Sequence, residues 1–187
     1  MLKQIGAALI EATARRRRVR VRANSHEAGK CEAALWKPMR RQELRQIVVA
    51  AQRYDVAKKR PGARNGPLGE VALRILGLMG SIIHKKTGQL DPSIEYLMRM
   101  LGRARDTIVR ALAALRAHGF LHWLRRFVPT GNAGERGPQV RQTSNAYRLT
   151  LPEHARAYLG KYGETPPLPE DVIDRRAEEL SDLRQAF

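Results

Sequence analysis

The chain has 187 residues, 43% of them hydrophobic, so it is long enough for one well-buried domain with extensions. Its 35 Lys and Arg against 18 Asp and Glu give a net charge of +17. No apolar stretch approaches the ~20 residues of a membrane span. The single cysteine, Cys31, excludes an intrachain disulfide and a cysteine zinc cluster. These features favour an intracellular, cytoplasmic protein that needs no membrane, metal or cofactor.

The positive charge is concentrated in the first 162 residues. From residue 163 to the end, seven acids and three arginines leave a net charge of −4, so residues 1–162 carry +21. Because each neutralised phosphate releases condensed counterions, a polyanion such as nucleic acid is the expected partner. A general preference for arginine in a GC-rich genome is the alternative, but it seldom gives such an excess over acids.

Residues 1–66 are predicted to form a basic, partly helical N-terminal extension. Apolar residues at helical spacing predict helices over 2–18 and 39–59, while 23–30 has the composition of a loop. The basic, Pro/Gly-rich stretch 58–67 is typical of a domain boundary. The end of the first helix and the residues that follow it form a basic arm that either follows phosphates or is a solvated tail. This arm consists of Arg15, Arg16, Arg17, Arg18, Arg20 and Arg22.

Residues 67–151 have the most regular pattern in the chain. Asp91 is the predicted N-cap of the second of three helices, with Pro92 at its first position, and Gly102 and Gly119 are typical of helix ends. The predicted elements are helices over 68–83, 92–101 and 105–117, a strand over 120–127, a polar loop over 129–144 and a strand over 145–151. This order predicts a mainly α protein with a small β-hairpin wing (α+β), that is, a winged helix-turn-helix with helical N- and C-terminal extensions.

Residues 152–187 are predicted to hold a short helix, a Pro-rich linker over 166–169 and an acidic helix over about 170–185. The acidic helix has an apolar stripe. It either folds back on the basic surface or binds a partner, and the sequence leaves both open.

The third helix of a helix-turn-helix enters the major groove with its first residues nearest the bases. The base-reading candidates are therefore Arg105, Asp106, Val109 and Arg110, since arginine's fork matches the two acceptors of guanine. Asp106 is expected more often to cap the helix or brace an arginine. Arg103 and Thr107 are placed for backbone phosphates. The wing adds four candidates, Arg125, Arg126, Arg136 and Arg141.

Other motifs in the chain favour packing over chemistry. Gly119 separates His118 from His122, so a zinc site is not expected. Trp36 and Trp123 are expected to pack. No phosphate-binding P-loop and no nucleophilic triad spacing is present, so the protein is not expected to be an enzyme.

The helix-turn-helix region also resembles a known family. Residues 97–112 and 115–121 are similar to the helix-turn-helix core of winged-helix proteins, with Gly102 in the turn and Arg105 opening the recognition helix. Residues 143–149 resemble the second wing strand. Ala104 departs from the pattern, since many relatives have a serine cap there. The whole resembles the "replication protein A" type of helix-turn-helix protein of alphaproteobacterial plasmids and mobile elements.

The resemblance implies a sequence-specific protein for double-stranded DNA, acting in replication initiation on a bacterial plasmid or mobile element. The alternative is a winged-helix transcription regulator, whose sites would adjoin promoters. An alternative of another class is a protein-interaction or RNA-associated module, whose activity would survive Arg105→Ala with Arg110→Ala. A homodimer and partner proteins of replication or transcription are left open.

Overall fold

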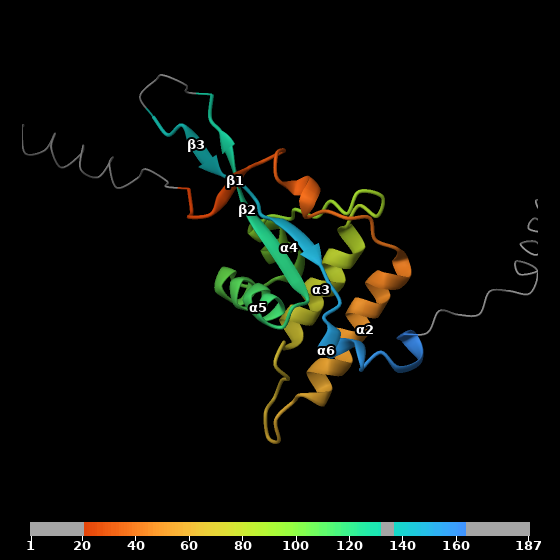
Figure 1. Cartoon of the computed structure of the whole chain (residues 1–187). Helices are drawn as coiled ribbons and strands as arrows, with labels where there is room; N and C mark the ends of the chain where they lie inside the picture. The colour runs from red at the N-terminus through yellow and green to blue at the C-terminus, as the bar shows by residue number, and fades with distance from the viewer. Residues whose placement is uncertain (1–20, 132–136, 164–187) are drawn as a thin grey trace, which may run out of the picture.

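The computed structural model describes residues 21–131 and 137–163, which form a mixed α/β structure of helices packed on a small sheet (Figure 1). In chain order its elements are β1 (Ser25–Glu27), η1 (Glu32–Ala34), α2 (Arg41–Ala57), α3 (Glu70–Ile82), α4 (Ile94–Leu101), α5 (Arg105–Ala117), β2 (Leu121–Pro129), β3 (Val140–Gln142), β4 (Ala146–Leu149), α6 (Glu153–Arg156) and η2 (Gly160–Gly163). The three helices and two strands predicted over 67–151 are present, but the polar loop predicted over 129–144 also contains a third strand, β3, which pairs with the end of β2.

One cluster of buried apolar side chains joins helices α2, α3 and α5 to strands β2 and β4. Helix α3 lies at its centre, since Ile75, Leu76 and Met79 are fully buried, as its apolar circumference predicts. The same cluster includes Leu44 of α2 and Leu159 near the end of the described chain. The division into 1–66, 67–151 and 152–187 stays a prediction, but α2 shares its core with the residues that follow.

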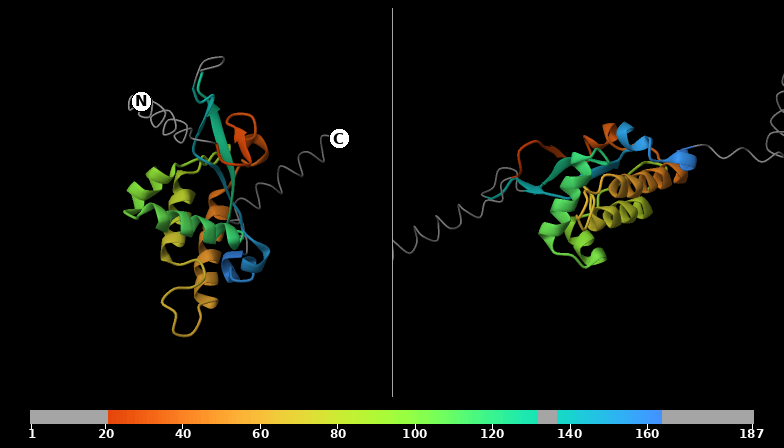
Figure 2. Two further views of the ribbon diagram at one scale, coloured as in Figure 1. Left: turned by 90° about the vertical axis from the view of Figure 1, so that its left-hand side faces the viewer. Right: turned by 90° about the horizontal axis from the view of Figure 1, so that it is seen from below.

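Strand β2 is the centre of the sheet and has two halves with different neighbours. Its first half pairs antiparallel with β4, from Leu121 opposite Leu149 to Leu124 opposite Ala146. Its second half extends beyond the helices and pairs antiparallel with β3, where Phe127 faces Gln142 (Figure 2). The first half therefore belongs to the core, and the second half forms a projecting β2–β3 hairpin.

Strand β1 corrects the prediction of a loop over 23–30. It pairs parallel with the second half of β2, with Ser25 opposite Arg125 and Glu27 opposite Phe127. The backbone N–H of Ala28 donates to the carbonyl of Phe127 at 2.9 Å. Three residues are too few to show an alternating pattern, so this strand is defined by its neighbour and not by its own sequence.

Helix α4 begins two residues later than predicted. Its N-cap is Ser93, whose hydroxyl accepts from the backbone N–H of Tyr96 at 3.0 Å. Asp91 is not the cap, because its carboxylate forms an ion pair with Arg126 instead. The predicted end of the helix is confirmed: Gly102 is left-handed, with a φ of 61°.

Helix α5 ends in the capping pattern that glycine favours. The N–H of Gly119 donates to the carbonyl of Arg116, and the N–H of Phe120 donates to that of Leu115. Since Phe120 and Leu121 are fully buried, this turn feeds the chain directly into the core half of β2. The start of α5 at Ala104 has no side-chain cap.

Several predictions lie outside the described residues: the helix over 2–18, the arm residues Arg15 to Arg20, Arg136, and the acidic helix over 170–185. Within the described part, the prediction of a short helix after residue 152 is confirmed by α6 and η2. None of the helices described there is long and apolar enough to cross a membrane.

Candidate nucleic-acid interface

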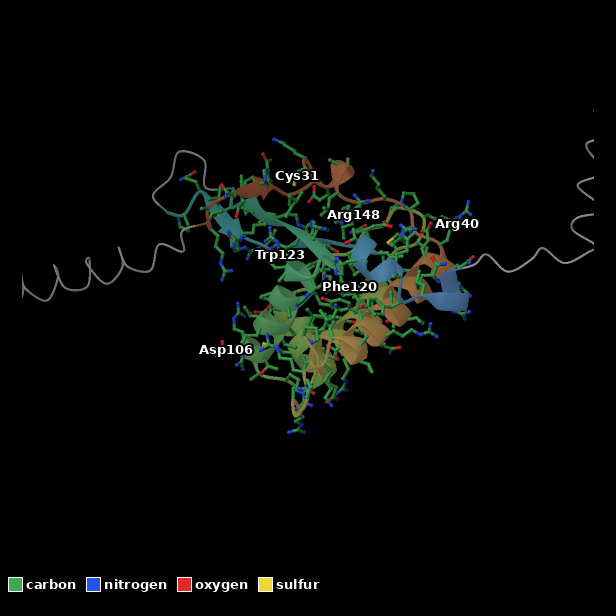
Figure 3. The ribbon with its side chains drawn as sticks, turned by 60° about the horizontal axis from the view of Figure 1, so that its bottom comes forward. Cys31, Arg40, Asp106, Phe120, Trp123 and Arg148 are labelled. Atoms are coloured by element: carbon green, nitrogen blue, oxygen red, sulfur yellow. The ribbon has the colours of Figure 1, made fainter. Side chains whose placement is uncertain are left out.

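The four predicted base-reading residues form one exposed surface, named here the α5 face. Arg105, Asp106, Val109 and Arg110 are all exposed, and Val109 is 44% accessible despite its apolar side chain. Spacings of one, four and five residues place them on one side of a helix with 3.6 residues per turn. Figure 3 shows Asp106 at the edge of the molecule, away from the core around Phe120. The sequence alone was enough to find this surface.

Arg105 is held by an acid that the sequence did not single out. Its Nη1 lies 2.8 Å from Oε1 of Glu95, in the first turn of α4. Hydrogen bonds from the backbone N–H of Glu95 itself and from Arg105 lower the pKa of Glu95. The ion pair crosses the turn between the helices and fixes one edge of the guanidinium. The acid that braces Arg105 is thus Glu95, and Asp106 neither braces it nor caps α5.

A pocket of about 270 Å³ lies between the starts of α4 and α5 and the segment from β3 to β4, and is named here the β3 pocket. Arg105, Glu95 and Asn145 line it together with Arg22 and Gln142. The backbone N–H of Arg22 donates to Oε1 of Gln142 at 2.9 Å. The only arm residue within the described chain therefore lies beside the start of α5, which sequence spacing could not indicate.

The predicted backbone residues Arg103 and Thr107 lie on the other side of α5. Both line a groove of about 470 Å³ together with Arg110, and Arg64 and Asn65 form its other wall. Arg103 is exposed and Thr107 is half-buried. The structure thus brings Arg103, Thr107 and Arg110 together in a surface distinct from the β3 pocket.

The predicted wing arginines differ in accessibility. Arg141 is exposed on β3, and Arg125 is half-buried, with its Nη1 donating to the carbonyl of Ala23 at 3.1 Å. Arg136 lies outside the described residues. Arg126 requires a correction, because its side chain is 7% exposed and points into the base of the hairpin. A buried guanidinium is not available to phosphates in this conformation.

Arg126 joins three segments at the base of the β2–β3 hairpin. Its Nη1 lies 2.8 Å from Oε1 of Glu32 and its Nη2 lies 2.9 Å from Oδ2 of Asp91. Its Nε donates to the carbonyl of Ser144 at 2.9 Å. Since these partners come from η1, the segment before α4 and the approach to β4, Arg126 ties the hairpin to the helices.

Glu32 is the buried acid of this group. Burial alone would raise its pKa, but hydrogen bonds from Arg126, Gly29, its own backbone and Cys31 outweigh burial and lower the pKa of Glu32 to about 2. The backbone N–H of Gly29 donates to both carboxylate oxygens, at 3.0 and 2.9 Å. Glu32 is therefore ionised at neutral pH and balances the charge of Arg126. Nothing in the local sequence identifies it.

The two tryptophans of the described chain are half-buried and pack against neighbouring side chains, as predicted, and one histidine is hydrogen-bonded to a buried tyrosine. Tyr54 Oη and His118 Nδ1 are hydrogen-bonded at 3.0 Å. Trp123 packs against Tyr147, and the guanidinium of Arg116 lies 4.4 Å from the Trp123 ring centroid. No group of three His, Cys, Asp or Glu side chains is placed to hold a metal within residues 21–131 and 137–163.

Comparison with known proteins finds a relative called "Replicating protein" in Rhizobium radiobacter. It is 41% identical to this chain over 153 residues, which make up 80% of the chain and 54% of the relative. The chain therefore spans about half the length of the protein it matches. No protein-family model matches the chain. No solved structure matches it either.

Proposed function

We propose that this chain is a winged helix-turn-helix protein that binds double-stranded DNA in replication. In this assignment α4 and α5 are the helix-turn-helix, α5 is the recognition helix and the β2–β3 hairpin is the wing. The order and packing of α3, α4, α5 and strands β2 to β4 support it. Figure 2 (right) shows α4 and α5 projecting from one side of the molecule, as a helix that enters a groove requires.

The observation that carries the proposal is the exposed polar face at the start of α5. Arg105 and Arg110 present guanidinium groups there, and Val109 offers an apolar contact beside them. In the major groove, an arginine fork can donate to O6 and N7 of guanine, and an apolar side chain can meet the methyl group of thymine. Glu95 restrains the guanidinium of Arg105, so the Arg105 side chain loses less entropy when it binds a base.

The replication role rests on the relative's name, together with the resemblance to plasmid replication proteins. The 41% identity covers most of this chain, so the elements described above fall largely within the matched length. In this proposal the chain recognises sites at an origin and catalyses no reaction. Activities of the rest of the relative are not assigned to it.

The first test is recovery of fragmented host DNA, plasmids included, by the purified chain at near-physiological salt, followed by sequencing. Enrichment of repeated sites on one replicon is the expected result. Enrichment beside promoters would instead indicate a transcription regulator. Uniform or absent recovery would contradict sequence-specific DNA binding and favour a protein or RNA partner.

The second test replaces the two arginines of the α5 face. Arg105→Ala with Arg110→Ala should weaken binding to the recovered site by about 1–3 kcal/mol for each base contact, and should weaken binding to random duplex by less. Arg45→Ala is the matched control, because Arg45 is exposed on α2 and lines neither the β3 pocket nor the groove beside Arg103. If the double variant and the control bound the recovered site with equal affinity, base reading by α5 would be wrong.

A further inference from the structure

The groove beside Arg103, named here the Arg64 groove, lies across α5 from the β3 pocket. At about 100° per residue, Arg105 in the β3 pocket and Ala114 in the Arg64 groove are about 180° apart around the helix axis. Asp106 and Val109 lie between them on the solvent side. The α5 face is therefore flanked by one groove on each side.

The wall of the Arg64 groove opposite α5 comes from the loop between α2 and α3. The composition of this basic stretch indicates only a domain boundary, but Arg64 and Asn65 line the groove directly. In Figure 1 the loop extends at the bottom of the molecule, below α3 and α5. A segment distant in sequence from the helix-turn-helix thus contributes to the surface around the recognition helix.

The end of this loop is fixed by a buried acid. Asp55 is 7% exposed, and its Oδ1 accepts from the backbone N–H of Leu68 at 2.7 Å and of Gly69 at 3.1 Å. At Gly66 the chain passes so close to the backbone of Asp55 that a Cβ would collide with it. Leu68 is itself buried in the core. These contacts hold the loop at the residues directly after Arg64 and Asn65.

The Arg64 groove is rich in cations that the described chain does not neutralise. Arg64, Arg103 and Arg110 line it, and within residues 21–131 and 137–163 none of them forms an ion pair. Arg110 only donates to the backbone carbonyl of Asp106, at 3.4 Å. The one acid that lines the groove, Glu70, lies 3.8 Å from Arg74, on the next turn of α3. Three arginines gathered this way attract an anion.

We infer that the Arg64 groove binds one sugar–phosphate strand of duplex DNA. This inference rests on the proposed function. A helix in the major groove, about 12 Å wide, lies between two phosphate backbones, so both flanks of α5 face phosphates. The hydroxyl of Thr107 and the amide of Asn65 supply neutral donors beside the arginines. The loop over 58–67 is then a DNA-backbone contact that positions α5 without reading sequence.

The test compares Arg64→Ala with Arg45→Ala, each in the full chain, on the recovered site and on a random duplex. Arg64→Ala should lose one phosphate contact, so the steepness with which log affinity falls against log salt should decrease by about 0.9. This corresponds to a roughly fivefold loss of affinity at 0.15 M salt. The loss should be equal on both duplexes. Because Arg64 is exposed, thermal unfolding of the variant should match that of the parent chain.

Neutralising single phosphates with methylphosphonates locates the contact. The parent chain should lose affinity when one or two phosphates flanking the major groove are replaced, and Arg64→Ala should be insensitive at those positions. If the parent chain binds DNA but Arg64→Ala binds it as well as Arg45→Ala does, the inference is wrong while the proposed function stands. An acidic protein segment then becomes the alternative occupant of the groove. A loss of affinity confined to the recovered site would also overturn the inference. If the parent chain binds no duplex DNA, both the inference and the proposed function are wrong.

Discussion

The α5 face and the base of the β2–β3 hairpin are both built around an arginine, but the surroundings of the two side chains differ. Arg105 is 49% exposed and faces Glu95, which is 71% exposed. Arg126 is 7% exposed and lies between Glu32 and Asp91, with Glu32 only 4% exposed. In water, an ion pair such as that of Arg105 contributes little to stability.

The buried pair behaves differently. Removing one partner of a buried pair leaves a charge without compensation, and this is far more costly than losing a surface pair. Arg126 therefore holds the hairpin in place, whereas Arg105 remains available to a ligand. Residue type and charge alone therefore do not separate a binding arginine from a structural one. The burial of the side chain and its number of acid partners separate the two kinds of arginine.

The largest expected effect comes from breaking the buried group. Arg126→Ala should lower the free energy of unfolding by about 3–5 kcal/mol, because Glu32 would stay buried without its cation. Chemical denaturation of the full chain measures this. Arg125→Ala is the control on the same strand, since Arg125 is half-buried and makes one hydrogen bond to a carbonyl. Equal stability of the two variants would contradict the structural role of Arg126.

A smaller effect should appear as a pH dependence of stability. The pKa of Glu32 is lowered in the folded chain to about 2 from its ordinary 4.5, so its ionised form stabilises the fold above pH 4.5. That contribution is lost as the pH falls from 4.5 towards 2. Glu32→Gln should cost about 2 kcal/mol near neutral pH, and its deficit relative to the parent chain should shrink in acid.

Denaturant unfolding of both chains across this pH range measures the difference. Glu70→Gln removes an exposed acid, with a side chain 66% accessible, and controls for the loss of one charge. A deficit of Glu32→Gln that stays constant down to about pH 2 would show that the carboxylate is not the source of the stability.

The smallest effect is expected at the surface pair of the α5 face. Glu95→Gln should change stability by less than about 0.5 kcal/mol, because both side chains are largely exposed. It should also reduce discrimination between the recovered DNA site and random duplex by about twofold to threefold, because Arg105 loses its restraint. Competition binding measures this, with Glu153→Gln on α6 as the control. If Glu95→Gln raised the affinity for both duplexes equally, Glu95 would act only as a nearby negative charge.

Much of the candidate interface could be predicted because its cause is local. Glycine at positions 102 and 119 takes the left-handed conformation that ends a helix, and the apolar spacing from 105 to 117 sets which side of α5 is buried. The exposed set, which includes Arg105 and Arg110, follows from that geometry. The start of α4 was misplaced because Asp91 and Ser93 are both suitable caps, and a distant arginine engages Asp91.

Local patterns are enough to predict the helices α2 to α5, the strands β2 and β4 and the accessible face of α5, since helical and alternating periodicities act between neighbours along the chain. Which charged residues meet, in contrast, depends on how the elements pack. Glu32 and Arg126 are 94 residues apart, and Arg64 reaches the groove of Arg103 because Asp55 anchors its loop. The strand β1 likewise exists only against β2. Such contacts depend on how elements pack in space, and no local pattern records them.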